Sequence, residues 1–278
     1  MTSDHERRER DAETLFSRTE YRRVIAWPER IRREAPFFDR CLGASPGKLL
    51  DVGSGTGEHA RHFAERGWRV VGVDVAEHMI ELANDHAGTT ETGGSVRFEL
   101  RDAADAAGLP EAPFDAAISI GNMLAFVEDE TALRRLLRGV AQALAPDAPF
   151  LVQLLNYERI VNGSVRALGV NVRPLPEEEG EGDIVFVRVF RPRADGALDF
   201  FPITLTVIPD ADPPAVVRSA KRGRHTPWLR DALLPAFESA GFDRVKTFGT
   251  MADVPFDTST SPDLVLLGYR RSELPPTA

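Results

Sequence analysis

Residues 49–60 read LLDVGSGTGEHA, and this stretch decides the fold. A short apolar run leads into three glycines at alternate positions, Gly53, Gly55 and Gly57, and a helical pattern begins at Glu58. This order predicts a buried strand, a tight turn and a helix entered at its N-terminus. Glycine suits the turn because the backbone takes positive φ there and a ligand can approach the main chain. The free N–H groups at the start of the helix then face an anionic group of that ligand.

The spacing of the glycines limits the classes of ligand that the turn can bind. A dinucleotide site uses G-x-G-x-x-G, in which the third small residue allows helix–strand packing. Here Glu58 occupies that third position, and a carboxylate close to a pyrophosphate is unfavourable. Residues 51–57 instead resemble the first motif of class I S-adenosylmethionine-dependent methyltransferases; the alternative is a glycine-rich turn in another α/β fold. The resemblance implies a loop that holds the amino-acid end of the cofactor, made of Asp51, Gly53, Ser54, Gly55 and Gly57.

Strand and helix patterns alternate along the first part of the chain. Further strands are expected over 69–73, 96–100, 114–120 and 149–155, with helices over 58–66, 77–86 and 131–144. Such alternation predicts a parallel, doubly wound sheet. Before it, apolar residues at helical spacing over 19–42 predict two or three short helices, interrupted at Pro28 and Pro36.

The pattern changes after residue 155. Residues 183–190 and 198–208 have strand composition and are joined by a turn containing Asp195-Gly196, which predicts an antiparallel hairpin. A helix over 229–240, capped by Gly241, and strands over 245–248 and 264–269 then return to the main sheet. Residues 89–95 are expected to form a loop.

The resemblance and these patterns together predict an α/β protein. Its core is a Rossmann-like, doubly wound, seven-stranded mixed sheet of the class I methyltransferase type, with an N-terminal helical cap and an inserted antiparallel β-lid. We expect the cap over 1–44, the cofactor-binding core over 45–155, the lid and substrate region over 156–224, and a C-terminal part of the core over 225–278.

Acidic residues follow two of the predicted strands. Ligands of open parallel sheets bind at the carboxyl ends of the strands. A carboxylate at Asp74 can accept both hydrogen bonds of a ribose diol; the alternative is a cap of the following helix. The resemblance implies that Val75 adjoins this site, that Asp102 accepts from the adenine amino group and that the N–H of Ala103 donates to a ring nitrogen. Met79 would cover the adenine or simply pack in the core.

Two later segments resemble glycine and sarcosine N-methyltransferases and their bacterial relatives. Ile120, Gly121 and Asn122 correspond to a loop at the methyl-transfer site, where the Asn122 amide faces the acceptor or the cofactor, unless it caps a helix. The pair Asn156 and Tyr157 resembles an Asn-Tyr pair that approaches the substrate; the alternative for Tyr157 is an aromatic ring covering a helix.

An N-terminal segment of the same relatives closes over the cofactor. The resemblance assigns this role to Tyr21, Trp27 and Arg30, of which Arg30 can grip a carboxylate with two hydrogen bonds. The alternative is a solvent-facing helix, because arginine-rich helices commonly face water.

Three histidines require separate interpretation. His225 follows the lid and could reach the acceptor as a base, or be structural. His59 and His62 lie three residues apart on one helix face, but no further His or Cys has the spacing that zinc needs. We therefore expect no metal and a solvent-facing helix start at both residues.

The composition excludes several classes of protein. A net charge of −9 argues against a general nucleic-acid binder, and no apolar run is long enough to span a bilayer. The single cysteine, Cys41, and the absence of a signal sequence at the start are typical of a cytoplasmic protein. No Asp/Asn-Pro-Pro-Tyr motif follows the strand over 114–120, which speaks against methylation of nucleic-acid bases.

The sequence therefore predicts an enzyme that transfers a methyl group in line from S-adenosylmethionine to a small-molecule acceptor, favouring an amine, with S-adenosylhomocysteine as product. A neutral amine requires no acid–base group, so no catalytic residue is assigned. The alternatives are a small-molecule O-methyltransferase, a nucleotide-binding oxidoreductase and a non-catalytic cofactor-binding module. Monomer and homodimer remain open, and neither nucleic acid nor a membrane is expected as a partner.

Overall fold

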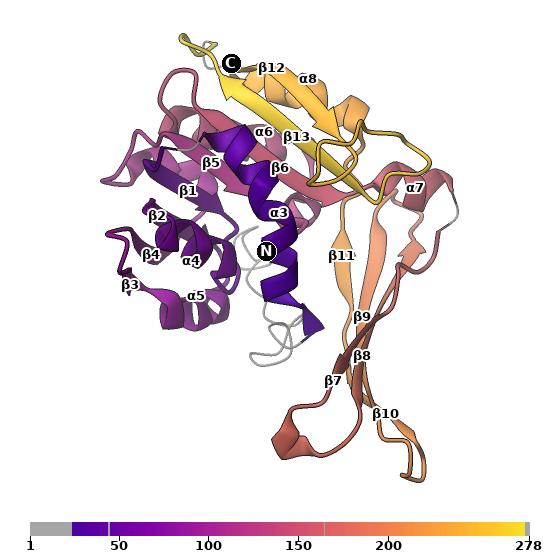
Figure 1. The fold of residues 1–278 in the computed structure, drawn as a ribbon. Coiled ribbons are helices and arrows are strands. Elements are labelled where there is room, and N and C mark those ends of the chain that lie inside the picture. The colour runs from indigo at the N-terminus through magenta and orange to yellow at the C-terminus, as the bar shows by residue number, and fades with distance from the viewer. Residues whose placement is uncertain (1–23, 44, 164, 276–278) are drawn as a thin grey trace.

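The computed structural model describes residues 24–43, 45–163 and 165–275 (Figure 1). Its core is a mixed sheet of eight strands in the order β12-β13-β6-β5-β1-β2-β4-β3. The strands are β1 (Lys48–Val52), β2 (Arg69–Asp74), β3 (Gly88–Thr89), β4 (Ser95–Leu100), β5 (Ala116–Ser119), β6 (Pro149–Leu155), β12 (Phe242–Phe248) and β13 (Asp263–Arg270).

The centre of this sheet is parallel. β1 pairs in parallel with β2 and β5, β2 with β4, and β5 with β6, whereas β13 runs antiparallel to β6 and β12 antiparallel to β13. The central strands are nearly continuous apolar runs because helices cover both faces. The predicted mixed, doubly wound sheet is confirmed. The structure adds a short eighth strand, β3, at an edge where we expected the loop to begin.

Helices form a layer on each face of the sheet. On one face lie α3 (Trp27–Leu42) and α4 (Glu58–Glu65), which bury Phe37, Phe38 and Phe63 against the strands. On the other lie α6 (Glu130–Ala143) and α8 (Arg230–Ala240), which bury Leu137 and Phe237. The shorter α5 (Glu77–Ala83), α7 (Tyr157–Asn162) and the 3-10 turns η1 (Asn84–His86), η2 (Ala103–Gly108), η3 (Met123–Phe126) and η4 (Glu177–Glu179) complete the connections.

The N-terminal prediction was wrong in one respect. Residues 27–42 form one continuous helix, α3, rather than short helices interrupted at Pro28 and Pro36. Pro28 lies in the first turn, where its missing N–H is not needed, and Pro36 lies inside the helix. Loss of one backbone hydrogen bond at Pro36 is offset because the residues that follow it bury two phenylalanine rings.

A second, antiparallel sheet is inserted between β6 and α8. Its strands are β7 (Asn171–Pro174), β8 (Asp183–Pro192), β9 (Leu198–Val207), β10 (Ala215–Ala220) and β11 (Gly223–His225). We call residues 171–225 the inserted sheet. The predicted hairpin is confirmed: β8 and β9 pair over their full length, and Gly196 in the turn has a φ of 83°.

Figure 1 shows the inserted sheet extending away from the core, with β7 and β10 toward its far end. Its other end contacts the core, because β11 packs against η3, which follows β5. The inserted sheet therefore forms a wall above the carboxyl ends of the parallel strands. None of the helices within the described ranges is both long and apolar enough to cross a membrane.

Candidate functional site

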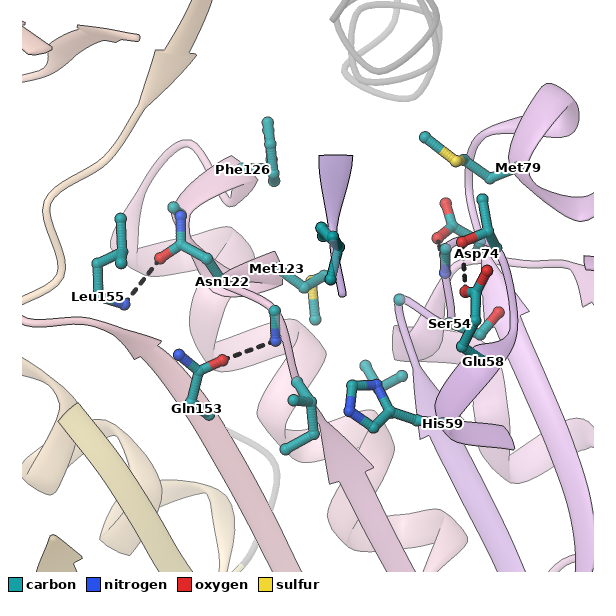
Figure 2. A pocket seen from close by; sticks show the side chains of 18 of the residues that line it. Ser54, Glu58, His59, Asp74, Met79, Asn122, Met123, Phe126, Gln153 and Leu155 are labelled. Atoms are coloured by element: carbon teal, nitrogen blue, oxygen red, sulfur yellow. Dashed lines mark hydrogen bonds between the residues drawn. The ribbon is translucent and has the colours of Figure 1, made fainter. Parts of the chain in front are cut away.

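One continuous cavity of about 520 Å³ runs along the carboxyl ends of the parallel strands. We divide it into two halves. The glycine-loop half is lined from β1, β2 and β4, and includes Gly53, Ser54, Gly55, Asp74, Met79 and Asp102. The inserted-sheet half is lined from β5, β6, β13 and the inserted sheet, and includes Asn122, Phe126, Leu155, Phe200, His225 and Asp263. Figure 2 shows Ser54, Glu58 and Asp74 gathered on one side and Asn122, Gln153 and Leu155 on the other.

The structure brings most of the predicted site residues to this cavity. Those that line it are Trp27, Arg30, Gly53, Ser54, Gly55, Asp74, Val75, Met79, Asp102, Ala103, Ile120, Gly121, Asn122 and His225. Asp51, Gly57, Asn156 and Tyr157 do not line it. Tyr21 lies outside the described residues.

The three glycines have positive φ for different reasons. A Cβ at Gly53 (φ 68°) would clash with the side chain of Met123, and one at Gly57 (φ 86°) would come within 2.6 Å of the Phe98 ring. A Cβ at Gly55 (φ 54°) would meet nothing within 4 Å. Gly53 and Gly57 therefore permit close packing, whereas Gly55 leaves open space at the cavity wall. The helix α4 begins immediately after this loop, with its first N–H groups toward the ligand edge.

Asp74 ties the glycine loop to the second strand. Its Oδ2 accepts a hydrogen bond from Gly55 N–H at 2.9 Å, and its Oδ1 accepts one from Ala76 N–H at 2.9 Å (Figure 2). Burial raises the pKa of Asp74, and the backbone hydrogen bonds from Ala76 and Gly55 oppose that rise. The Asp74 side chain thus fixes the turn before α5 and also lines the cavity.

A second carboxyl group lies beneath the loop. Asp51 is only 3% exposed, and its Oδ2 has no hydrogen-bond partner in the described part of the chain. Burial, helped by the negative charges of Asp74 and Glu58, raises the pKa of Asp51 to about 8. Asp51 is therefore largely protonated at neutral pH and adds little negative charge to the cavity. Glu58 itself lines the cavity and accepts a hydrogen bond from the Thr56 hydroxyl.

At the far end of the glycine-loop half, Asp102 caps η2. Its Oδ1 accepts from Ala104 N–H at 2.9 Å, and its Oδ2 pairs with Arg135. Met79 lines the cavity nearby and is 8% exposed, so it both packs in the core and contributes an apolar wall. Both readings of Met79 made from the sequence are compatible with this position.

The first turns of α3 cross the cavity between the two halves. Arg30 donates from Nε to Glu34 Oε1 at 2.9 Å, and its guanidinium lies 5.2 Å from the centroid of the Trp27 ring. Glu34 Oε2 lies 2.9 Å from His59 Nε2. Burial would raise the pKa of Glu34, but the His59 hydrogen bond and the Arg30 charge outweigh it and lower the pKa to about 2. An ionised Glu34 therefore fixes Arg30 at the cavity.

The expectation that His59 faces solvent was wrong. His59 is 7% exposed and bonded to Glu34, because α3 covers this face of α4. Glu34, which holds both side chains, was not singled out in the sequence, since an acid within an arginine-rich helix suggests local ion pairs at a surface. Within the described ranges no group of three or more His, Cys, Asp or Glu side chains is arranged to hold a metal ion.

Asn122, Tyr157 and His225 form a hydrogen-bonded chain in the inserted-sheet half. Asn122 Oδ1 accepts from Leu155 N–H at 3.0 Å, which orients the amide, and its Nδ2 donates to the Tyr157 hydroxyl at 2.9 Å. The Tyr157 hydroxyl lies 2.9 Å from His225 Nδ1. The Tyr157 hydroxyl has two acceptors within reach, His225 Nδ1 and Asn122 Oδ1 at 3.2 Å, and the tautomer of His225 depends on which of them takes its proton.

His225 is enclosed by aromatic rings. It stacks on Phe200, with ring centroids 4.4 Å apart, and meets Phe126 edge to face at 4.9 Å. Burial lowers the pKa of His225 to about 3, so the ring is neutral and a weak base at neutral pH. Its Nε2 has no hydrogen-bond partner among the described residues. A buried ring of such low basicity is poorly suited to removing a proton from an acceptor.

Asn156 serves the fold instead of the cavity. Its Oδ1 accepts from Arg159 N–H and caps α7, and its Nδ2 donates to the carbonyl oxygens of Asp257, Thr258 and Ser261. Tyr157 lies behind Asn122 and His225 and is 1% exposed. Of the predicted Asn-Tyr pair, only Tyr157 thus connects to the cavity, and it does so through its neighbours.

The sequence reasoning missed Gln153 and Asp263. Gln153 Oε1 accepts from Gly121 N–H at 2.8 Å (Figure 2), and Gln153 Nε2 donates to Asp263 Oδ1 at 2.9 Å. Both residues line the cavity. A signal was present, because Asp263 begins an antiparallel strand whose start must lie at the ligand edge of the sheet.

Comparison with protein-family models identifies a methyltransferase domain over residues 49–147. The chain is 28% identical over 195 residues to a glycine/sarcosine N-methyltransferase of Parasynechococcus marenigrum, covering 65% of this chain and 67% of that protein. It is 34% identical over 109 residues to a ubiquinone biosynthesis O-methyltransferase of Idiomarina loihiensis, covering 39% and 42%.

A similar fold occurs in a solved structure with a bound ligand. The S-adenosylmethionine-bound amino pentose methyltransferase of calicheamicin biosynthesis from Micromonospora echinaspora superposes with a TM-score of 0.67 at 21% identity. The match covers 93% of this chain and 99% of that one. The agreement thus extends across the core sheet and into the region of the inserted sheet.

Proposed function

Because this chain belongs to the class I S-adenosylmethionine-dependent methyltransferases, we propose that it methylates an amino nitrogen of a small-molecule acceptor. The observation that carries the proposal is the single cavity joining the glycine-loop half to the inserted-sheet half. A group bound in one half can face a group bound in the other, as a methyl transfer requires.

The residues of the glycine-loop half fit the cofactor. Gly55 leaves space at the wall, and we assign the amino-acid end of the cofactor to the loop of Gly53, Ser54 and Gly55, with Arg30 for its carboxylate. Asp74 would accept from the ribose hydroxyls. Asp102 and the N–H of Ala103 would contact the adenine, with Val75 and Met79 as its apolar cover. When bound, the cofactor supplies a methyl group made electrophilic by its sulfonium.

The inserted-sheet half suits a small organic acceptor. Phe126, Leu155 and Phe200 supply apolar walls, while Asn122 and His225 supply polar edges held in place by the hydrogen bonds to Tyr157. A cavity of about 520 Å³ lies within the size range of small-molecule and cofactor sites. These residues would orient the acceptor and exclude water.

The state of His225 supports nitrogen over oxygen as the methylated atom. A hydroxyl acceptor must lose its proton as it is methylated and benefits from a general base whose pKa lies near neutrality. His225 has a pKa of about 3 because of burial, so it cannot take that role efficiently. A neutral amine already carries a lone pair and needs only alignment with the methyl group.

Calorimetric titration with S-adenosylmethionine, S-adenosylhomocysteine and NADH tests the cofactor. We expect micromolar binding of the first two and none of NADH, because Glu58 lies where a pyrophosphate would need a small neutral residue. Binding of NADH alone would favour an oxidoreductase, and binding of none of the three would favour a module that does not use this cofactor.

Matched acceptor pairs test the methylated atom. Glucosamine with glucose, benzylamine with benzyl alcohol, and glycine with glycolate are each incubated with S-adenosylmethionine, and formation of S-adenosylhomocysteine is measured. We expect turnover with an amine of at least one pair and none with its hydroxyl partner. Turnover confined to hydroxyl compounds would overturn the assignment to nitrogen and favour the O-methyltransferase alternative, for which the similarity to the Idiomarina protein is the reason.

A further inference from the structure

Asp263 is a carboxylate of the cavity that the function described so far does not use. It begins β13 and pairs in register with Leu155, at the end of β6. β13 is separated from the glycine-bearing end of β1 by β6 and β5, so three strand spacings, ~14 Å, lie between them. Asp263 thus belongs to the inserted-sheet half of the cavity.

One oxygen of Asp263 is held by the protein. Gln153 donates from Nε2 to Asp263 Oδ1 at 2.9 Å, and the other end of the same amide accepts from Gly121 N–H at 2.8 Å. The backbone donor determines which end of the Gln153 amide is oxygen, so the amide must present its NH₂ group to Asp263. The orientation of the carboxylate is therefore set by the loop of residues 120–122, at the centre of the cavity.

The other oxygen, Oδ2, has no hydrogen bond or ion pair within the described ranges. Burial raises the pKa of Asp263, although the Gln153 hydrogen bond and the charges of Arg30 and Arg188 oppose the rise. Neither arginine forms a salt bridge with it. Oδ2 is therefore free to accept a hydrogen bond from a molecule bound in the cavity.

From this geometry we propose that Asp263 binds the amino group of the acceptor, through an N–H···Oδ2 hydrogen bond. The proposal deepens the proposed function and rests on it, because it gives the amine a specific partner at the cavity wall. Gln153 acts as a positioning residue that links this partner to Gly121. A neutral amine that donates one N–H to Oδ2 keeps its lone pair free for the methyl group, so this contact would orient the acceptor nitrogen toward the cofactor.

The α-ammonium group of the cofactor is the other N–H donor that could reach Asp263, because Arg30 is among the electrostatic neighbours of Asp263. Two probes distinguish an amine on the acceptor side from the α-ammonium group of the cofactor, and neither requires that the acceptor be known. S-adenosylhomocysteine and sinefungin share the same α-amino-acid group, but in sinefungin a carbon bearing an amino group replaces the sulfur. Only sinefungin therefore has an amine directed to the acceptor side.

The experiment is calorimetric titration of both probes into the wild-type chain and Asp263→Asn. Asn can still accept the Gln153 hydrogen bond, and we expect the melting temperature to be unchanged or raised, since a buried charge is removed. We expect the variant to bind sinefungin at least tenfold more weakly and S-adenosylhomocysteine within threefold of wild type. Asp263→Glu, which keeps the charge, should recover part of the sinefungin affinity.

Asp253→Asn is the matched control. Asp253 lies in the connection between β12 and β13, is exposed, does not line the cavity, and forms an exposed ion pair with Arg40 at 3.8 Å. Such an exposed pair contributes little to stability. Its φ of 61° is tolerated by Asn as well as Asp, so the fold should not change. The control removes the same charge and should leave the ratio of the two affinities at the wild-type value.

Each other outcome overturns the proposal. An equal loss for both probes would assign Asp263 to the α-ammonium group of the cofactor. No loss for either, or a loss also in Asp253→Asn, would mean that the carboxylate has no specific amino partner. If wild type binds neither probe, the proposed function itself fails, which is a different result from a failure confined to Asp263.

Discussion

The two halves of the cavity are built in different ways. In the glycine-loop half, the shape comes from main chain: positive φ at Gly53 and Gly55, and backbone N–H groups that donate to Asp74. In the inserted-sheet half, the shape comes from the side chain of Asn122, which precedes η3, and from side chains of β6, α7, β9, β11 and β13. These side chains meet only in the folded protein. One half is local in the sequence and the other is not.

The difference between the two halves indicates which part of the cavity can vary in acceptor specificity. A backbone loop offers the same N–H groups whatever its neighbours, so it suits a cofactor that does not change. The side-chain chain of Asn122, Tyr157 and His225 depends on three separate elements, and each can be altered without moving the sheet. The inserted-sheet half is therefore the part that determines the acceptor, and the fold alone does not identify it.

The sharpest test of the backbone-built half compares two glycines of the loop. Gly53→Ala places a Cβ against Met123 at a positive φ, so we expect the free energy of unfolding to fall by about 3 kcal/mol. Gly55→Ala meets no atom within 4 Å, so only the φ strain of about 1–2 kcal/mol should remain. Urea denaturation of both variants measures the difference.

Ligand affinity should depend on Gly55, although its substitution is expected to cost less stability than that of Gly53. Because the new methyl group of Gly55→Ala extends into the cavity, we expect its affinity for S-adenosylhomocysteine to fall at least tenfold while the fold is retained. If Gly55→Ala bound S-adenosylhomocysteine as tightly as wild type, the cofactor would not occupy the open space at this glycine. The description of this half as a cofactor site shaped by main chain would then be wrong.

The contrast also explains what the sequence could predict. The fold followed from local signals: three glycines after an apolar run, and strand patterns alternating with helical ones. Most predicted residues of the glycine-loop half line the cavity for the same reason. The burial of His59 could not be read locally, because it depends on α3 crossing α4 and on Glu34, which is far from it in the sequence.

In the inserted-sheet half, single residues were found but their connections were not. Asn122, Tyr157 and His225 were each candidates, yet nothing in the sequence indicates that they bond to one another across separations of 35 and 68 residues. Asn156, next to Tyr157, faces the loop of residues 257–261 instead. Asn156 is the N-cap of α7 and Tyr157 is the first residue of that helix, and only the packed structure determines which of the two side chains meets the residues of the cavity.

Tyr157→Phe tests whether the inserted-sheet half is held by this side-chain chain. The change removes one hydroxyl and leaves the part-buried Asn122 Nδ2 and the buried His225 Nδ1 without that partner. We expect a loss of about 2 kcal/mol in the free energy of unfolding, since unsatisfied buried groups cost about 1–3 kcal/mol. Affinity for S-adenosylhomocysteine should change by less than threefold. A large loss of that affinity would mean that the two halves are not independent.

The smallest expected effect concerns the pH dependence of stability that His225 produces. Burial holds its pKa at about 3 in the folded chain, below the ordinary value of 6.5. Below pH 6.5 the unfolded chain binds a proton that the folded chain does not, so stability is full above pH 6.5 and is lost as the pH falls toward 3. The slope should approach about 1.4 kcal/mol for each pH unit.

His225→Gln isolates this contribution, because Gln can still accept from Tyr157 but does not titrate. The stability difference between wild type and variant, measured by urea denaturation at pH 7.5 and 5.5, should shrink by about 1.4 kcal/mol at the lower pH. The direction matters more than the size. A difference that grows on acidification would mean that folded His225 is readily protonated, which would restore it as a general base and remove the argument for nitrogen over oxygen as the methylated atom.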